Sequence, residues 1–223
     1  MIMKHVMLTM MAGLLMAVAT QSCKKDTNDP EKNGSKGKLS DAVPEEYLKK
    51  LKDNGMRLHD GSNPPNIEGK YLFSPLLFEF NSLPLFSGQL GRITDDEIRI
   101  QFSGQGAGSQ DIEVTAESRS HLMNVTSSHV LASPFVVGSG NDFTVCFELS
   151  QYTPDAFFTI TYAYLVSGTK EGNVLKDVQL ARVCINDDKL SEAYREAYQD
   201  IGGGFLGYTE LFSDVDGVSG QVP

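Results

Sequence analysis

Hydrophobic and polar residues alternate with period two over most of the chain that follows Tyr71. The alternating hydrophobic positions fall in four runs: Ile98, Ile100 and Phe102; Ile112, Val114 and Ala116; Phe143, Val145, Phe147 and Leu149; and Phe158, Ile160, Tyr162, Tyr164 and Val166. Such alternation indicates strands that pack one face inward and turn the other to water. Together with a first strand that begins at Tyr71 and two more strands expected near 174–185 and 205–212, the pattern predicts about eight antiparallel strands.

Clusters of glycine and small polar residues separate these runs, at 104–108, 138–142 and 167–169. Such clusters predict turns between successive strands. An antiparallel meander of this length has to protect its edges, either by closing into a barrel or by packing as a two-sheet sandwich. The predicted fold class is therefore mainly β, with barrel and sandwich both open.

Two segments have helical rather than strand periodicity. Residues 44–54 open with Pro44 and two glutamates, which suit a helix N-terminus, and place three hydrophobic residues on one face: Tyr47, Leu48 and Leu51. Residues 190–198 repeat Leu, Ala and Tyr at spacings of three and four, ahead of the glycines at 202–204. We expect a short N-terminal helix and a second helix before the last strand.

The N-terminus has the pattern of an export signal. Lys4 precedes an uncharged, mostly apolar run, Val6–Ala19, which is shorter than the roughly 20 residues that a membrane-spanning helix needs. Small residues then lead to Cys23. We predict a lipoprotein signal peptide at 1–22 and lipid attachment at Cys23; the alternative is an ordinary secretory signal followed by a chance cysteine.

Residues 23–43 are rich in Lys, Asp, Asn, Gly and Ser, and poor in apolar side chains. Such a segment buries too little surface to offset its ordering entropy. It is predicted to be a flexible lipidated tether, and residues 44–223 are predicted to form a single β-rich domain.

Two motifs resemble known lipoproteins. The sequence at 22–26, Ser-Cys-Lys-Lys-Asp, resembles the start of Bacteroidota lipoproteins, and the absence of Asp at position 24 implies placement in the outer membrane, with cell-surface exposure also open. The run Asn63–Tyr71, NPPNIEGKY, resembles the opening of a family of uncharacterised Bacteroidota outer-membrane lipoproteins. Gly69 and Tyr71 are also similar to the first strand of calycin (lipocalin-like) barrels, although this chain has no tryptophan. That likeness implies a calycin-like barrel.

Charge and cysteine content narrow the possible partners. The full chain has a net charge of −10, and removal of Lys4 with the signal makes this −11. An acidic surface repels phosphate backbones, so nucleic acid is not an expected partner. After lipidation of Cys23, the thiols of Cys146 and Cys184 remain, either bridged or buried separately.

No pattern in the sequence predicts a catalytic, metal or cofactor site. His59, His121 and His129 lie far from any tight cluster of ligands, so we expect them to be surface or loop residues. Asp214, Asp216 and Gly217 resemble the start of a calcium loop without its glutamate, and a turn is expected there. The aromatic residues Phe158, Tyr162 and Tyr164 either line a cavity or fill the core.

These features favour a non-enzymatic domain that binds a small ligand or an envelope partner, attached to the membrane by its N-terminal lipid. A structural or adhesive surface module is the first alternative. A glycan-processing enzyme with unidentified carboxylates is the second.

Overall fold

The chain folds into two β-sheets and a pair of helices. A computed structural model describes residues 37–82, 88, 90–94, 97–120, 125–130, 132–153, 158–186, 209–214 and 218–220. The helices are α2 (Leu39–Ala42) and α3 (Glu45–Asp53). The strands are β1 (Ser62–Asn63), β2 (Gly69–Phe73), β3 (Leu76–Asn81), β4 (Ile93–Thr94), β5 (Glu97–Ser103), β6 (Glu113–Ser120), β7 (Val125–Val130), β8 (Ala132–Ser139), β9 (Asp142–Thr153), β10 (Phe158–Glu171), β11 (Val174–Asn186), β12 (Thr209–Asp214) and β13 (Val218–Gly220).

The larger sheet contains nine of these strands. Its path runs β1-β8-β9-β10-β11-β12-β3-β4, and β13 pairs with β11 off this path. All its pairings are antiparallel except that of β1 with β8. The mainly β fold class is confirmed. The predicted count of about eight is low, because β1, β4 and β13 are only two or three residues long and because β3, β7 and β8 are not among the predicted runs.

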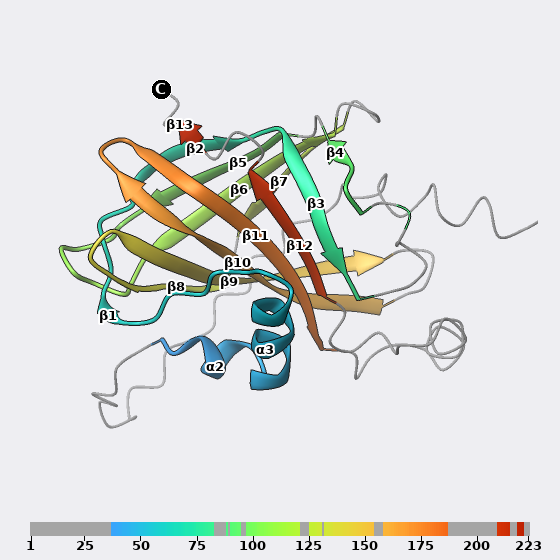
Figure 1. The fold of residues 1–223 in the computed structure, drawn as a ribbon, viewed down its shortest axis with the longest axis horizontal. Coiled ribbons are helices and arrows are strands. Elements are labelled where there is room, and N and C mark those ends of the chain that lie inside the picture. Colours follow the sequence, from blue (N-terminus) through green and yellow to red (C-terminus); the bar gives the residue numbers. More distant parts are fainter. Residues whose placement is uncertain are drawn as a thin grey trace, which may run out of the picture.

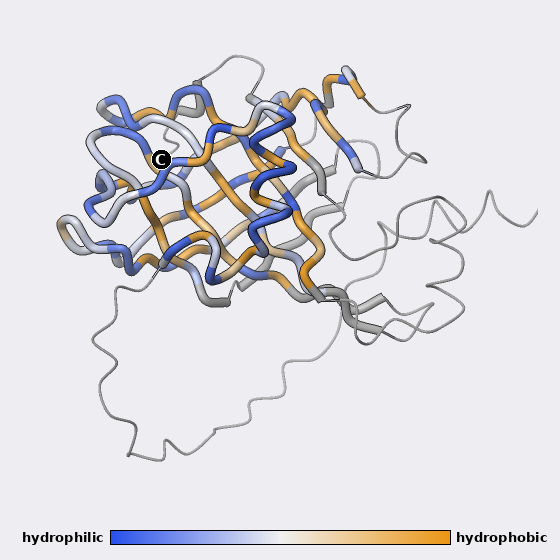
Figure 2. The backbone as a smooth tube through the Cα atoms, turned by 60° about the horizontal axis from the view of Figure 1, so that its bottom comes forward, coloured by the Kyte–Doolittle hydropathy of each residue, from blue (hydrophilic) through white to orange (hydrophobic). Residues whose placement is uncertain are grey.

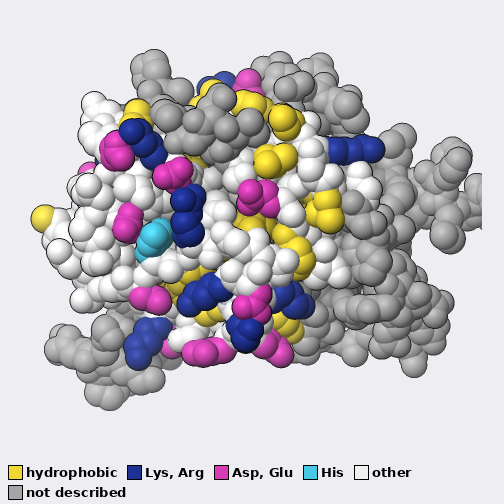
Figure 3. Space-filling view, in the orientation of Figure 1, with side chains coloured by type: hydrophobic (Ala, Val, Ile, Leu, Met, Phe, Trp, Pro, Cys, Tyr) yellow, Lys and Arg dark blue, Asp and Glu magenta, His cyan; other side chains and the backbone are white. Residues whose placement is uncertain are grey.

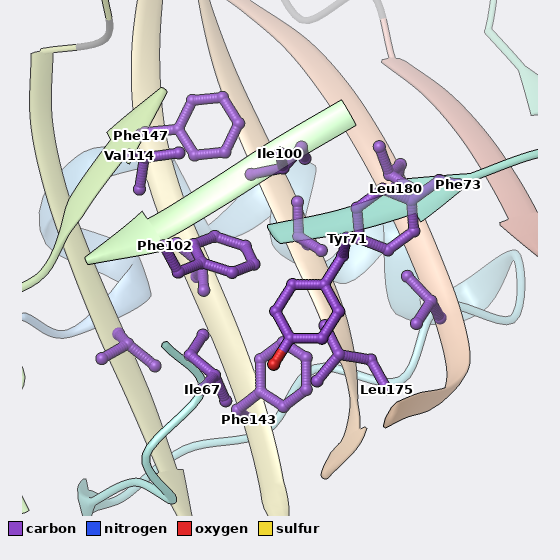
Figure 4. Close-up of a cluster of buried hydrophobic side chains, with 14 of the residues drawn as sticks. Ile67, Tyr71, Phe73, Ile100, Phe102, Val114, Phe143, Phe147, Leu175 and Leu180 are labelled. Carbon is purple, nitrogen blue, oxygen red and sulfur yellow. The ribbon is translucent and has the colours of Figure 1, made fainter. Parts of the chain in front are cut away.

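The smaller sheet, β2-β5-β6-β7, packs on one face of the larger sheet (Figure 1). The space between them is filled by buried side chains from both sheets, and Figure 4 shows the aromatic rings that meet there. The largest of these side chains have no more than 3% of their surface exposed: Tyr71, Phe73, Ile100, Phe102, Phe143 and Phe147. We call this side of the larger sheet its inner face.

The helices cover the opposite, outer face of the larger sheet (Figure 1). Leu39, Val43 and Leu51 are buried there against hydrophobic residues of β8 to β12. Full burial of a leucine contributes about 1.5–3 kcal/mol relative to an exposed one. The predicted N-terminal helix is confirmed as α3, although Pro44 caps it rather than starting it.

The predicted flexible tether, residues 23–43, is too long at its C-terminal end. Residues 39–42 form α2, and a capping box between Lys38 and Asp41 closes its first turn. The sequence prediction missed this helix because it is one turn long, and because Leu39 and Val43 are the only large apolar residues in a polar segment.

The structure decides only in part between the barrel and the sandwich that the sequence left open. The two sheets meet at one edge, where an isolated bridge joins Asp111 to Phe135 and Val136 N donates to Gln110 O at 2.9 Å. The described strands remain two separate sheets and form no closed barrel, so the calycin-like barrel is not confirmed.

The turn predicted at residues 167–169 is wrong. These residues lie inside β10, and the chain reverses at Gly172, whose φ of +58° suits glycine. Gly168 instead meets a close neighbour, because a Cβ there would lie 2.9 Å from the backbone oxygen of Lys176. Glycine in this strand marks close packing rather than a turn.

Residues 56–68, which we call the strap, run from α3 to the smaller sheet. The strap crosses the outer face, pairs with β8 through β1, and rounds the edge of the sheet to reach β2. Gln105 holds its far end, because its side chain accepts from Ile67 N at 2.9 Å and donates to Pro65 O at 2.9 Å. Gln105 therefore fixes the NPPNIEG motif in place, and Gly69, with a φ of +148°, begins β2.

Hydrophobic segments concentrate in the strands, and polar segments occupy the hairpin ends and the outer side of the helices (Figure 2). On the helix-bearing face, basic and acidic side chains are interspersed, with hydrophobic side chains between them (Figure 3). Within the part of the chain that the structure describes, no helix is long and apolar enough to span a membrane.

Candidate functional site

A row of polar side chains crosses the outer face of the larger sheet. Thr144, Ser167 and Gln179 are direct neighbours on β9, β10 and β11, and each is no more than 6% exposed. We call them the outer row. Their burial requires hydrogen-bond partners, because an unsatisfied buried polar group costs about 1–3 kcal/mol.

The strap supplies those partners. His59 N donates to Thr144 Oγ1 at 2.9 Å, Thr144 Oγ1 donates to Ser167 Oγ at 3.3 Å, and the Ser167 hydroxyl donates to Arg57 O. Gln179 accepts from Arg57 N at 2.8 Å and donates to Gly55 O at 3.1 Å. The outer row therefore fixes the strap to the sheet.

His59 is the one predicted histidine whose side chain the structure describes. Its Nδ1 lies 4.0 Å from Asp142 Oδ2, and Asp142 Oδ1 accepts from the Thr169 hydroxyl at 2.7 Å. Ser167, which is near in the fold, donates to a backbone carbonyl rather than to a base. This geometry is a surface histidine beside a carboxylate, as expected from the sequence, and not a nucleophile with its base.

The possible disulfide between Cys146 and Cys184 is not formed. β10 lies between their strands, which are therefore about 9–10 Å apart, and the register offsets the two cysteines by a further three residues along β10. A disulfide needs a Cα–Cα distance of about 4.4–6.8 Å. They also point to opposite faces, because Cys146 packs in the outer cluster and Cys184 follows Val183, which packs there too. Burial and the charge of Glu148 raise the pKa of Cys146 to about 12, which makes it unreactive.

A second polar and aromatic row crosses the inner face of the same sheet. The register links Phe147 on β9 to Tyr164 on β10, and Tyr164 to Arg182 on β11. The same line of backbone pairs continues to Glu210 on β12 and Asn81 on β3. We call these five positions the inner row.

The inner row lies next to a line of purely hydrophobic pairs. The neighbouring line consists of Val145, Val166, Leu180, Phe212 and Phe78. Two residues along β9 to β12, and three along β3 where the register shifts, the hydrophobic positions give way to an aromatic pair, a cation, an acid and an amide. Arg182 lies two residues after the core residue Leu180 on β11, so the two side chains point to the same face of the sheet. A charged residue therefore occupies a position where the alternation predicts an apolar side chain.

Ring contacts fix the geometry of this cluster. Phe147 and Tyr164 stack with centroids 5.5 Å apart and an interplanar angle of 4°. Tyr162 meets Tyr164 edge-on, with centroids 6.3 Å apart and planes at 69°. The Arg182 guanidinium carbon lies 5.0 Å from the centroid of the Tyr162 ring, within cation–π range.

Exposure distinguishes the two rows. Tyr164, Arg182 and Asn81 are half-buried, whereas every side chain of the outer row is buried. Aromatic faces beside a guanidinium and hydrogen-bonding side chains can hold a ring-shaped polar ligand, because rings stack and the guanidinium offers a rigid fork of donors.

The other polar contact on the inner face lies on β2 and β10. Tyr71 is fully buried, and its hydroxyl accepts from Lys170 Nζ at 2.6 Å and donates to Glu68 O at 3.2 Å. Burial raises the pKa of Tyr71 to about 12 and lowers the pKa of Lys170. Both hydrogen bonds of the Tyr71 hydroxyl are made to residues of the same domain, so the Tyr71–Lys170 pair has a structural role at one end of the core.

The sequence marked one position of the inner row, Tyr164, and the nearby Tyr162, without assigning either of them a ligand. Tyr162 and Tyr164 were recognised as lining a cavity or filling the core, and the structure gives each a different place: Tyr162 is buried and Tyr164 half-buried. Arg182 was missed, although its position in the inward phase of a predicted strand was a usable signal.

Several predicted features lie outside the described residues: Cys23 with the signal peptide, His121, the helix at 190–198, and Asp216 with Gly217. The side chains of His129 and Phe158 also lie outside them. Among the described residues, no group of three or more His, Cys, Asp and Glu side chains is arranged to hold a metal ion.

Comparison with known protein families, curated proteins and solved structures found no match for this chain.

Proposed function

We propose that this protein is a lipid-anchored binding module of a bacterial outer membrane, and that the inner row is its ligand-binding surface. The anchor in this proposal is Cys23, behind the export signal at 1–22. Several acyl chains hold a protein stably, since each buried methylene contributes about 0.8 kcal/mol. The resemblance to Bacteroidota outer-membrane lipoproteins supports the same placement.

The observation that carries the proposal is the cluster of Arg182, Tyr162 and Tyr164 at inward positions of the sheet, in which Arg182 and Tyr164 are half-buried and Tyr162 is buried. Placing a charge beside a hydrophobic core costs desolvation free energy. Charged groups in such costly positions are concentrated at functional sites. On the outer face, the buried polar side chains of the outer row are hydrogen-bonded to the strap.

Binding rather than catalysis is proposed because the row has the wrong composition for hydrolysis. Glycan hydrolysis uses two carboxyl groups about 5–10 Å apart. The register of the inner row contains one acidic position, Glu210. The buried hydroxyls of Thr144 and Ser167 on the other face are held in the hydrogen-bond chain to the strap.

A structural or adhesive module is the second candidate, and the packed interior favours it. Aromatic side chains fill the space between the sheets, and Tyr71, Phe73 and Phe102 are each no more than 1% exposed (Figure 4). Large hydrophobic residues are exposed at Leu90 (43%) and Ile93 (60%), near the sheet edge formed by β4. An adhesive role predicts that Ile93→Ser abolishes attachment to a partner, while Tyr164→Leu has no effect.

The anchor and the binding surface are tested separately. Mass spectrometry of the N-terminal peptide of the native protein should show Cys23 as the acylated first residue, and Cys23→Ser should leave the protein outside the membrane fraction. Saturation-transfer NMR with a panel of ring-shaped probes (trisaccharides, benzyl alcohol and benzoate) should show binding to the wild type that Tyr164→Leu removes. Equal binding by both proteins would contradict the site.

A further inference from the structure

We infer that residues 38–60 are a releasable part of the tether: tension on the lipid anchor detaches them from the outer face before any strand of the two sheets separates. We call these residues, which comprise α2, α3 and the first part of the strap, the arm. The inference rests on the proposed anchor at Cys23 and adds a mechanical property to it. It follows from the kinds of contact that hold successive parts of the N-terminal chain.

Side-chain contacts hold the arm on the sheet. Among the described residues, the backbone–backbone hydrogen bonds of the arm join its own residues to one another, as Met56 N does in donating to Leu51 O at 3.0 Å. The sheet is contacted by buried hydrophobic side chains of the arm, and the side chains of the outer row bond to the backbone of Gly55, Arg57 and His59. Detachment of the arm therefore breaks no strand pairing.

Backbone pairing with the sheet begins directly after the arm. Gly138 N donates to Gly61 O at 3.0 Å, and the next two residues form β1, which pairs with β8. Gln105 then accepts from Ile67 N and donates to Pro65 O. A pull that has removed the arm therefore meets a second and different kind of attachment from Gly61 onward.

The hydrophobic clusters divide at the same place. The buried hydrophobic residues of the arm belong to the cluster on the outer face: Leu39, Val43, Tyr47, Leu48, Leu51 and Met56. The cluster between the two sheets contains no residue of the arm, and the chain joins it at Ile67. Segments with their own set of contacts can open while the rest of a protein stays folded. The cluster between the sheets can therefore hold them together after the arm has left.

Release of the arm lengthens the tether. An extended chain spans at most about 3.3–3.6 Å per residue, so residues 38–60 can add about 80 Å. A domain that is bound to a partner and pulled away from the membrane gains this reach while both sheets stay folded.

Single-molecule pulling on the mature chain tests the inference. One handle is an enzymatic tag in place of Cys23, and the other is attached through Asn173→Cys at the exposed hairpin end between β10 and β11. A reversible first step that releases up to about 80 Å of chain should precede the unfolding of the sheets at higher force. Leu51→Ala should lower the force of the first step only, and Ile100→Ala, between the sheets, the force of the second step only. A single step in which the arm and the sheets come apart together would overturn the inference.

The two thiols on opposite faces of the larger sheet provide a test without applied force. Cys146 packs in the cluster that the arm covers, whereas Cys184 lies on the inner face. In dilute urea, below the unfolding transition, N-ethylmaleimide should alkylate Cys146 at least about tenfold faster than Cys184, as peptide mass spectrometry can measure. Leu51→Ala should raise the rate at Cys146 by about tenfold or more and leave Cys184 unchanged, and Lys52→Ala should change neither rate.

The outcomes separate this inference from the proposed function. Equal alkylation rates for the two thiols of the wild type would mean that the arm opens only together with the sheets, which contradicts the inference and leaves the lipid anchor unaffected. The anchor is tested by mass spectrometry of the native protein, and an unmodified Cys23 would overturn the proposed anchor instead.

Discussion

The outer and inner rows are polar lines on opposite faces of one sheet, and they differ in what their polar groups do. On the outer face, a chain of hydrogen bonds runs from His59 N through Thr144 and Ser167 to Arg57 O, entirely within the fold. On the inner face, Tyr164 and Arg182 are half-buried and stack in an aromatic cluster. The contrast teaches that buried polar residues alone do not indicate function. What distinguishes a candidate site is polar groups that the fold holds in place without fully burying them.

The largest expected effect comes from weakening the packing of α3 on the outer face of the larger sheet. Leu51→Ala removes a fully buried side chain from α3 and should lower the free energy of unfolding by about 2–5 kcal/mol. Denaturant unfolding measures this loss. The Cys146 thiol, which packs in the same cluster, should then react faster with Ellman's reagent. The matched control is Lys52→Ala on the exposed side of the same helix, and equal stability of the two variants would contradict the docking of α3.

Breaking the outer row itself is expected to cost somewhat less. Gln179→Leu leaves Arg57 N and Gly55 O without their side-chain partner, and should lower the free energy of unfolding by about 2–4 kcal/mol. Probe binding at the inner row should not change. Gln101→Leu on the exposed face of β5 serves as control; a loss in Gln179→Leu no larger than in this control would show that the strap is held by other contacts.

The buried phenol of Tyr71 should make the fold sensitive to alkali. Its pKa is about 12 in the folded state and 10.0 in the unfolded chain, so the protonated form is favoured by folding. That stabilisation is complete below pH 10 and is lost between about pH 10 and 12. Tyr71→Phe should cost about 1 kcal/mol at pH 7 and reduce the loss above pH 10.

Denaturant midpoints measured from pH 8 to 12 test this point. Cys146 shifts in the same direction, so part of the alkaline loss should persist in Tyr71→Phe and disappear only when Cys146→Ala is added. Identical pH profiles for the wild type and Tyr71→Phe would show that folding does not raise the pKa of Tyr71.

The smallest effect on stability is expected at the inner row. Tyr164→Leu replaces a half-buried ring and should change the free energy of unfolding by about 1 kcal/mol or less. The same substitution should have the largest effect on probe binding. Urea unfolding and titration of one variant give both numbers, and a stability loss above about 3 kcal/mol would make the inner row structural, like the outer one.

Strand positions were predictable because alternation is a local property, as in β9, β10 and β11. The turn placed at Gly168 failed because a glycine required by close packing has the same sequence signal as a glycine in a turn. α2 was missed because one helical turn has too few residues to show a period. Pairing across the sheet is not local, so the alignment of Arg182 with Tyr164 and Glu210 could not be derived from the sequence. The separation of Cys146 and Cys184 by β10 depends on the same pairing.

Tyrosine side-chain NMR tests the central claim most directly, because the chain has eight tyrosines and no tryptophan. With ¹³C-labelled tyrosine rings assigned by single Tyr→Phe variants, titration with the tightest-binding ring-shaped probe should shift the resonances of Tyr162 and Tyr164. The resonances of Tyr47, on the buried side of α3, and of Tyr71, at the Lys170 contact, should not move. Shifts confined to Tyr47 or Tyr71, or no shift in any ring at saturating probe, would contradict the assignment of the inner row as the binding surface.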